Sequence, residues 1–164
     1  MSHIFRAYDV RGVFNLDLDV ESALRIGLAF GTYLNGKAKV CIGRDGRKTS
    51  LAIENAFISG LVSTGCSAVS VGMVPISTSN FFTYKGKYDC GAYITASHNP
   101  PEYNGVRFRH SDGSGYTKDN EEIKKIFLDG NFLKAKWNRI GEIEHIDSNK
   151  VIDEYIGYIR KRIK

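Results

Sequence analysis

Two apolar runs with a helix-like segment between them constrain the fold of this chain more than any other feature. Residues 39–43 and 67–73 are short, apolar and rich in β-branched side chains, and each ends at a turn-forming sequence, as buried strands do. Between them, residues 51–62 place apolar side chains at helical spacing, with Ser50 as a candidate N-cap and Gly65 in position to end the helix. This order predicts a parallel pair of strands joined by a crossover helix.

The same alternation of strands and helices continues along the chain. The further predicted elements are strands at 89–95 and 106–110 and helices at 20–34, 76–84, 119–128 and from 151 to the chain end. Only a loop separates the strand at 106–110 from the strand before it, so we expect these two to be antiparallel. Residues 130–150 are polar and irregular. Together the elements predict one domain over residues 1–164, a three-layer α/β/α unit with a mixed, mostly parallel sheet.

The end of the chain carries a basic cluster on the last predicted helix. Arg160, Lys161, Arg162 and Lys164 would suit a helix C-terminus electrostatically. The helix is predicted to run to the last residue, with no cap and no stop signal such as a glycine. We therefore expect the natural chain to continue and this domain to be part of a longer multidomain protein.

The composition narrows the class of protein. With 42% hydrophobic and 25% charged residues, the 164-residue chain suits one soluble domain with a core. Its net charge of +5 comes from dispersed basic residues, so we expect no nucleic-acid partner. No apolar run approaches the roughly 18 residues of a membrane span, and the N-terminus lacks a signal pattern. Cys41, Cys66 and Cys90 form no CxxC pair and are expected to be buried thiols in a reducing, cytoplasmic setting.

A serine turn follows the strand predicted at 89–95. Residues 95–101 read Thr-Ala-Ser-His-Asn-Pro-Pro, and the double proline cannot continue a regular element. Ser97 therefore lies just past the C-terminal end of a strand, the edge where open α/β sheets bind ligands. The turn lacks the glycines of a G-x-S-x-G nucleophile elbow, and adjacent residues such as Ser97 and His98 point apart in most backbones. These features disfavour acyl transfer.

Phosphoryl transfer requires cations around the moving group more than a strong base. Arg11 ends an irregular N-terminal segment, Arg107 follows the serine loop, and Arg44 and Arg47 follow the first strand of the crossover pair. Parallel strands would bring the Arg44 loop and the Ser97 loop to one edge of the sheet.

Other charged residues near these motifs are expected to have structural roles. We expect Arg44 and Arg47 to shape their turn, with Asp45 pairing with Arg47 or capping the next helix. Arg109 and His110 alternate with a phenylalanine, which indicates a solvated strand face.

Three motifs in order make the pattern specific. Residues 5–12 read Phe-Arg-Ala-Tyr-Asp-Val-Arg-Gly, residues 43–47 read Gly-Arg-Asp-Gly-Arg, and residues 95–105 read Thr-Ala-Ser-His-Asn-Pro-Pro-Glu-Tyr-Asn-Gly. Together they resemble the N-terminal domain of the α-D-phosphohexomutases, and the first motif looks most like the phosphomannomutase/phosphoglucomutase branch. Phosphoglucosamine mutase specificity is the alternative within this family.

The resemblance implies an isomerase of four domains, an intramolecular phosphotransferase. Ser97 matches the family's active-site serine, which is phosphorylated and ligates Mg²⁺ through its phosphate. The phosphoserine donates to a hexose phosphate, and the resulting hexose 1,6-bisphosphate reorients and returns its other phosphate. Tyr8 and Arg11 would line the substrate cleft, and His98 would orient substrate hydroxyls or exchange protons with them. Arg107 stands where the family commonly has lysine, and an arginine acts by its charge rather than as a base.

The resemblance also indicates what this chain lacks. The family's aspartate-rich metal loop and its sugar-recognition loops lie in later domains, so we expect the remaining domains as partners and no turnover from residues 1–164 alone. A non-catalytic phosphoacceptor or binding module is the competing class, and a serine hydrolase is the weakest candidate because the elbow glycines are missing.

Overall fold

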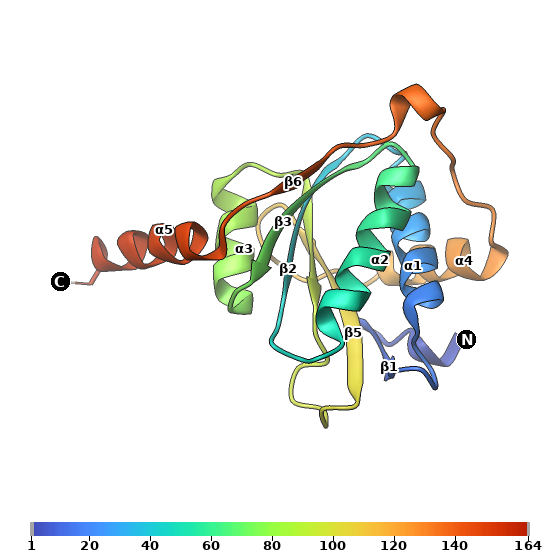
Figure 1. Cartoon of the computed structure of the whole chain (residues 1–164), viewed down its shortest axis with the longest axis horizontal. Helices are drawn as coiled ribbons and strands as arrows, with labels where there is room; N and C mark the ends of the chain where they lie inside the picture. Colours follow the sequence, from blue (N-terminus) through green and yellow to red (C-terminus); the bar gives the residue numbers. More distant parts are fainter. Residues whose placement is uncertain (1, 164) are drawn as a thin grey trace.

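The computed structural model describes residues 2–163, which form a six-stranded sheet with helices on both faces (Figure 1). The strands are β1 (Val10–Val13), β2 (Lys39–Arg44), β3 (Ser67–Met73), β4 (Cys90–Ile94), β5 (Tyr103–His110) and β6 (Ile143–His145). The helices are α1 (Val20–Tyr33), α2 (Ser50–Ser63), α3 (Ile76–Lys85), α4 (Asp119–Asp129) and α5 (Ser148–Arg160), with 3-10 turns η1 (Ser2–Ile4) and η2 (Trp137–Arg139).

The sheet has the order β1-β5-β4-β2-β3-β6. β2 is parallel to both β3 and β4, and β6 is parallel to β3. β5 is antiparallel to its two neighbours, β4 and β1. The predicted parallel pair, its crossover helix α2 and the antiparallel strand after the serine loop are therefore confirmed. A mixed, mostly parallel sheet results.

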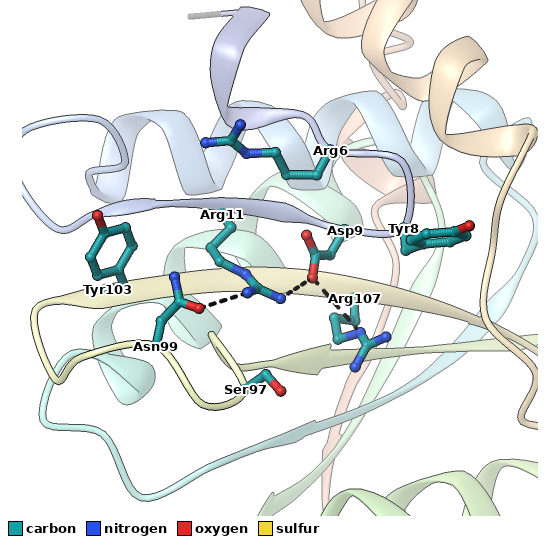
Figure 2. A pocket seen from close by; sticks show the side chains of 8 residues that line it. All are labelled: Arg6, Tyr8, Asp9, Arg11, Ser97, Asn99, Tyr103 and Arg107. Carbon is teal, nitrogen blue, oxygen red and sulfur yellow. Dashed lines mark hydrogen bonds and ion pairs between the residues drawn. The ribbon is translucent and has the colours of Figure 1, made fainter.

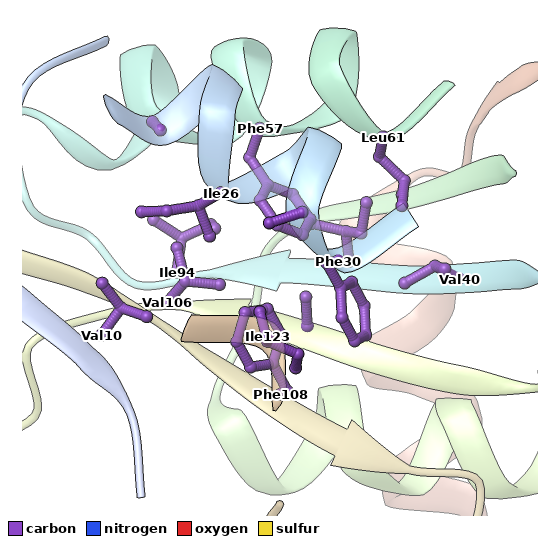
Figure 3. Close-up of a cluster of buried hydrophobic side chains, with 14 of the residues drawn as sticks. Val10, Ile26, Phe30, Val40, Phe57, Leu61, Ile94, Val106, Phe108 and Ile123 are labelled. Carbon is purple, nitrogen blue, oxygen red and sulfur yellow. The ribbon is translucent and has the colours of Figure 1, made fainter. Parts of the chain in front are cut away.

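Two hydrophobic cores occupy the two faces of the sheet, as a three-layer α/β/α fold requires. The larger core lies under α1, α2 and α4, where Phe30 stacks on Phe108 of β5 with ring centroids 4.3 Å apart (Figure 3). The smaller core joins Cys41 of β2 to Phe82 of α3 and Val151 of α5. Because successive strand residues face opposite sides, Val40 and Cys41 belong to different cores.

Helices α1 and α2 cross with their backbones in contact. A Cβ added at Gly27 would lie 2.1 Å from the carbonyl oxygen of Phe57, and one at Gly60 would lie 2.0 Å from that of Leu24. Both distances are far below van der Waals contact, so the crossing requires glycine on both helices. This close approach brings α1 and α2 together over the same face of the sheet.

Three elements differ from the sequence-based expectations. β1 forms within the N-terminal segment that we expected to be irregular, because its partner β5 is distant in sequence. β6 forms within 130–150, where all three strand residues are exposed and so leave no burial pattern. The last helix ends at Arg160, with Lys161 as its C-cap, rather than running to the chain end. Lys164, the last member of the basic cluster, lies outside the described residues.

The start of α2 also differs from the expectation. Thr49 is the N-cap residue, and Ser50 is the first residue of the helix. The Ser50 hydroxyl donates to Asp45 Oδ1 at 2.6 Å, so it binds the preceding turn instead of capping the helix. Gly65 follows the C-cap residue with a φ of +105°, which confirms its predicted place at the helix end.

The three cysteines are free and buried, as predicted. Burial raises the pKa of the Cys41 thiol to about 11 and that of Cys90 to about 12. Thiols with raised pKa values hold little thiolate at neutral pH, which makes these two poor nucleophiles. Within residues 2–163, no helix combines the length and apolar character needed to cross a membrane.

Candidate active site

The serine turn and the loop after β2 meet at one edge of the sheet, as the parallel strands predicted. Residue pairs from Val40 with Cys90 to Arg44 with Ile94 keep β2 and β4 in register up to their C-terminal ends. Beyond them, the Asp45 amide donates to the Ile94 carbonyl oxygen at 3.0 Å. The two loops are thus joined at the edge where ligands bind in this class of sheet.

Ser97 is exposed on this turn in a left-handed backbone conformation. Its φ is +57°, a value that costs a residue with a side chain about 1–2 kcal/mol. Its amide donates to Thr95 Oγ1 at 2.9 Å. The Ser97 Oγ lies 3.1 Å from His98 Nδ1, so this turn does bring the adjacent side chains together, contrary to the expectation for most backbones.

Ser97 faces a pocket of about 480 Å³ between the turn, the N-terminal segment and β5 (Figure 2). It is lined by Arg6, Tyr8, Asp9, Arg11, Ser97, Asn99, Tyr103 and Arg107. The structure therefore places Tyr8, Arg11, Ser97 and Arg107 around one cavity. His98 lines an adjoining pocket of about 380 Å³, to which Ser97 and Arg107 also contribute.

Arginines dominate the charge of the larger pocket. Arg11 forms an ion pair with Asp9 and donates from Nη1 to Asn99 Oδ1 at 2.8 Å (Figure 2). Arg107 Nε lies 4.0 Å from the same Asp9 carboxylate, which is 5% exposed. The Nε atoms of Arg11 and Arg107 are buried and form no hydrogen bond with the described residues. One carboxylate therefore serves two guanidiniums, and the site has an excess of positive charge suited to an anion.

The strand that carries Arg107 is less solvated than predicted. Arg109 is partly buried, and this burial, together with the charge of Arg107, lowers its pKa. His110 stacks on the Tyr116 ring with centroids 4.1 Å apart and lies 3.7 Å from an Asp119 carboxylate oxygen. The expected solvated face is therefore only partly confirmed: Arg109 is half-buried, and the segment after β5 packs on His110, whose side chain stays 44% exposed.

The loop after β2 has the structural role that we predicted. Asp45 pairs with Arg47, with Oδ2 and Nε 3.1 Å apart. Arg44 pairs at 2.8 Å with the buried carboxylate of Glu54 on α2, which also accepts from the Ser70 hydroxyl at 2.7 Å. Neither Arg44 nor Arg47 lines the larger pocket.

Sequence reasoning overlooked four of the residues that line the larger pocket: Arg6, Asp9, Asn99 and Tyr103. Each lies within residues 5–12 or 95–105, two of the three sequence motifs, but the motifs alone do not show which side chains come together in the pocket. Asp9 is the most important of the four, because it connects the two arginines. In the part of the chain that the structure describes, no group of three or more His, Cys, Asp or Glu side chains could hold a metal ion.

The fold and the site define an α/β/α domain that presents a serine to an arginine-lined pocket at the strand ends. Residues 2–134 match the family model for phosphoglucomutase/phosphomannomutase, alpha/beta/alpha domain I. The chain belongs to this family.

Two curated relatives and one solved structure illustrate the similarity. A protein of Thermococcus kodakarensis named "Phosphoglucomutase/phosphomannomutase" is 41% identical, with 99% of this chain and 36% of the relative covered. Another from the same organism, named "Probable phosphoglucosamine mutase", is 42% identical, with 100% and 36% covered. The crystal structure of a phosphoglucomutase/phosphomannomutase family protein from Burkholderia thailandensis matches with a TM-score of 0.86 and 32% identity, covering 100% of this chain and 36% of that one.

These relatives are mutases, a class of isomerases. The chain spans about a third of their length, with 36% of each covered. In them, this domain is one part of a larger polypeptide.

Proposed function

We propose that this chain is the phosphoserine-bearing domain of a phosphohexomutase, which interconverts hexose 1-phosphates and hexose 6-phosphates. The observation that carries this proposal is the exposed Ser97 hydroxyl on a left-handed turn, facing the pocket that Arg11 and Arg107 make positive. A phosphate on Ser97 would bring a charge of about −2 into this pocket, and nearby guanidiniums stabilise such a group by charge-assisted hydrogen bonds.

The reaction consists of two phosphoryl transfers in opposite directions. A hydroxyl of the hexose phosphate attacks the phosphorus of phosphorylated Ser97. Its O–P bond forms as the Ser97 O–P bond breaks, the attacking hydroxyl gives up its proton, and the leaving Ser97 oxygen takes up a proton. The resulting hexose 1,6-bisphosphate turns around in the cleft. The Ser97 hydroxyl then attacks the other phosphoryl group and gives up its proton, as the sugar O–P bond breaks and the product hydroxyl takes up a proton. The serine is rephosphorylated, and the net result is a shift of phosphate between positions 1 and 6.

Each residue around Ser97 has a proposed role in these steps. Arg11, fixed by Asp9 and Asn99, and Arg107 stabilise the charge of the moving phosphoryl group. Tyr8, 62% exposed at the pocket rim, contacts the substrate. His98, within 3.1 Å of the Ser97 hydroxyl, orients substrate hydroxyls or exchanges protons with them.

Mg²⁺ is the proposed metal, and the chain's own contribution to its site is an oxygen of the Ser97 phosphate. Phosphate oxygens are preferred Mg²⁺ ligands. The nearby Asp9 carboxylate is already paired with Arg11, so the phosphate is the metal ligand that this pocket offers. Bound Mg²⁺ would neutralise phosphate charge. Its remaining ligands would come from polypeptide outside residues 1–164, which the greater length of the relatives leaves room for. The three free thiols suit a reducing compartment, and we place the reaction in the cytoplasm.

Glucose and mannose phosphates are the proposed substrates. Aminosugar phosphates are the second candidate, because a relative named "Probable phosphoglucosamine mutase" is 42% identical to this chain. A non-catalytic phosphoacceptor domain is the competing class of function.

Turnover of the natural polypeptide that contains this domain tests the proposal. Glucose 1-phosphate, mannose 1-phosphate and glucosamine 1-phosphate are each supplied with a trace of the matching 1,6-bisphosphate, and 6-phosphate formation is followed with and without Mg²⁺. We expect Mg²⁺-dependent conversion of glucose and mannose phosphates, and none by the 164-residue chain alone. Conversion of only the aminosugar would establish the second candidate. A phosphorylated Ser97 without conversion of any sugar would establish the phosphoacceptor.

Replacement of Arg107 by lysine tests whether this residue acts by charge. We expect Arg107→Lys to retain turnover within about tenfold and Arg107→Ala to lose roughly 10²–10³-fold, because a cation at this position stabilises the transferring phosphoryl group. The pH dependence of kcat/KM separates the two cations. A lysine can deprotonate as pH rises, so the Arg107→Lys profile should fall at high pH where the wild-type profile stays flat. A lysine variant faster than the wild type would show that this position serves as a base.

A further inference from the structure

Arg47 follows β2 and binds the serine turn through backbone oxygens. Its acceptors are the carbonyl oxygens of Pro100 (2.7 Å) and Tyr103 (3.1 Å) for Nη1, and those of Asn99 (2.8 Å) and Ser97 (2.9 Å) for Nη2. Nε donates to Asp45 Oδ2 at 3.1 Å. Because a guanidinium has five N–H donors, these bonds use all of them.

This arrangement separates Arg47 from the arginines of the pocket. Arg11 and Arg107 line the cavity beside Ser97, and each has a buried Nε without a hydrogen bond to the described residues. Arg47 instead lines a different hollow, together with Lys48 and Pro101. Its side chain is 13% exposed, and its donors are occupied. Arg47 therefore serves the turn and not a phosphate ligand.

The contacts of Arg47 complete a closed ring around Ser97. The Ser97 amide donates to Thr95 Oγ1 at 2.9 Å, and the Thr95 hydroxyl donates to Asp45 Oδ2 at 2.7 Å. The same Asp45 oxygen accepts from Arg47 Nε, and Arg47 Nη2 donates to the Ser97 carbonyl. Both backbone polar groups of Ser97 are thus tied to one ion pair. A rotation of Ser97 out of its left-handed conformation would break bonds on both sides.

We propose that Arg47 is a positioning residue that fixes the location of the phosphoryl group on Ser97. Its fork binds four carbonyl oxygens of the loop, whose partial negative charge would otherwise be free to repel a phosphate. The Ser97 side chain is left at a fixed distance from Arg11 and Arg107. The inference rests on the proposed phosphorylation of Ser97. It concerns the position of the phosphate relative to Arg11 and Arg107, which can also be measured on a phosphate introduced without catalysis.

Lysine cannot reproduce this contact. An ammonium group offers three donors from a single point, whereas Arg47 reaches four carbonyls and a carboxylate through a planar fork. Arg47→Lys therefore keeps the positive charge but loses the planar fork that binds the four carbonyl oxygens. Arg44→Lys is the matched control, because Arg44 pairs with Glu54 and makes no hydrogen bond to the turn.

The experiment places phosphoserine at position 97 of the 164-residue chain by stop-codon suppression and titrates it by phosphorus NMR. With the wild-type loop, we expect a phosphate pKa about one unit below the value of about 6 for free phosphoserine, because Arg11 and Arg107 favour the dianion. In Arg47→Lys, we expect about half of this shift to be lost, since the phosphate no longer has a fixed position. In Arg44→Lys, we expect the wild-type pKa.

Thermal unfolding of the same samples separates positioning from general stability. If Arg47→Lys and Arg44→Lys lower Tm to a similar extent and only Arg47→Lys moves the phosphate pKa, the positioning role is supported. An unchanged phosphate pKa in a folded Arg47→Lys domain would overturn it. The phosphate is installed without catalysis, so this result is independent of whether the turnover assay shows a mutase.

Discussion

Replacement of Ser97 by alanine is expected to lower mutase turnover by roughly 10⁴-fold or more, as removal of a nucleophile does in other enzymes of covalent mechanism. In the proposed mechanism, the Ser97 hydroxyl oxygen donates the phosphoryl group in the first transfer and accepts one in the second, and alanine offers no oxygen in its place. The backbone contacts of Ser97 with Thr95 and Arg47 do not involve its side chain, so the turn should keep its shape. The assay follows the formation of hexose 6-phosphate. Intact-mass measurement of the protein shows whether a phosphate is attached to it.

The control for this change is Ser59→Ala. Ser59 is exposed on α2, and its hydroxyl donates to the Asn55 carbonyl within the same helix at 2.9 Å. We expect this variant to keep both its turnover and its phosphate. Undiminished turnover in Ser97→Ala would refute the phosphoserine mechanism, and a phosphate that persists in that variant would place the modification on another residue.

The second large effect is expected at the crossing of α1 and α2. Gly27→Ala should lower the free energy of unfolding by about 1–3 kcal/mol or more, because the added methyl would lie 2.1 Å from the Phe57 carbonyl oxygen. The helices must move apart, which loosens the contact of Phe30 with the sheet below them. The loss outweighs the roughly 1 kcal/mol that alanine gains over glycine in a helix. Urea unfolding followed by far-UV circular dichroism measures the change.

Gly157 on α5 provides the matched control. Apart from its own helix backbone, a Cβ at this position meets no atom of residues 2–163 within 4 Å, so Gly157→Ala should raise stability by up to about 1 kcal/mol. The same substitution is therefore expected to have opposite signs on two helices of one domain. Equal stabilisation by Gly27→Ala and Gly157→Ala would show that α1 and α2 are not held in backbone contact in solution.

Local sequence patterns were sufficient to predict most of the fold. β2, β3 and β4 are buried strands that end at turn sequences, and α2 carries its apolar residues at helical spacing, so their order alone implied the parallel sheet. β1 and β6 were missed for a physical reason. Each is a short edge strand whose existence depends on a partner elsewhere in the chain, Val10 pairing with Val106 and Ala68 with Ile143.

The site was predictable at the level of motifs and not at the level of contacts. The order of the strands brought the Ser97 turn and the Arg47 loop to one edge, as expected. The positions of their side chains depend on the left-handed backbone of Ser97 and on the shared carboxylate of Asp9, neither of which follows from residue type. The same backbone explains why Ser97 and His98 meet despite being adjacent.

The pairing of β1 with β5 has a consequence for the order in which the molecule assembles. The Arg11–Asn99 hydrogen bond joins residues 88 positions apart, and β1 pairs with β5 at Val10 and Val106. Forming contacts between residues so far apart in sequence closes a long loop, and the entropy cost of that closure delays these contacts in folding. On the ribosome, Arg11 is made early but has no partner strand until β5 emerges. The pocket beside Ser97 therefore cannot be completed during synthesis until β5 has emerged, when the β2-α2-β3 unit can already have folded.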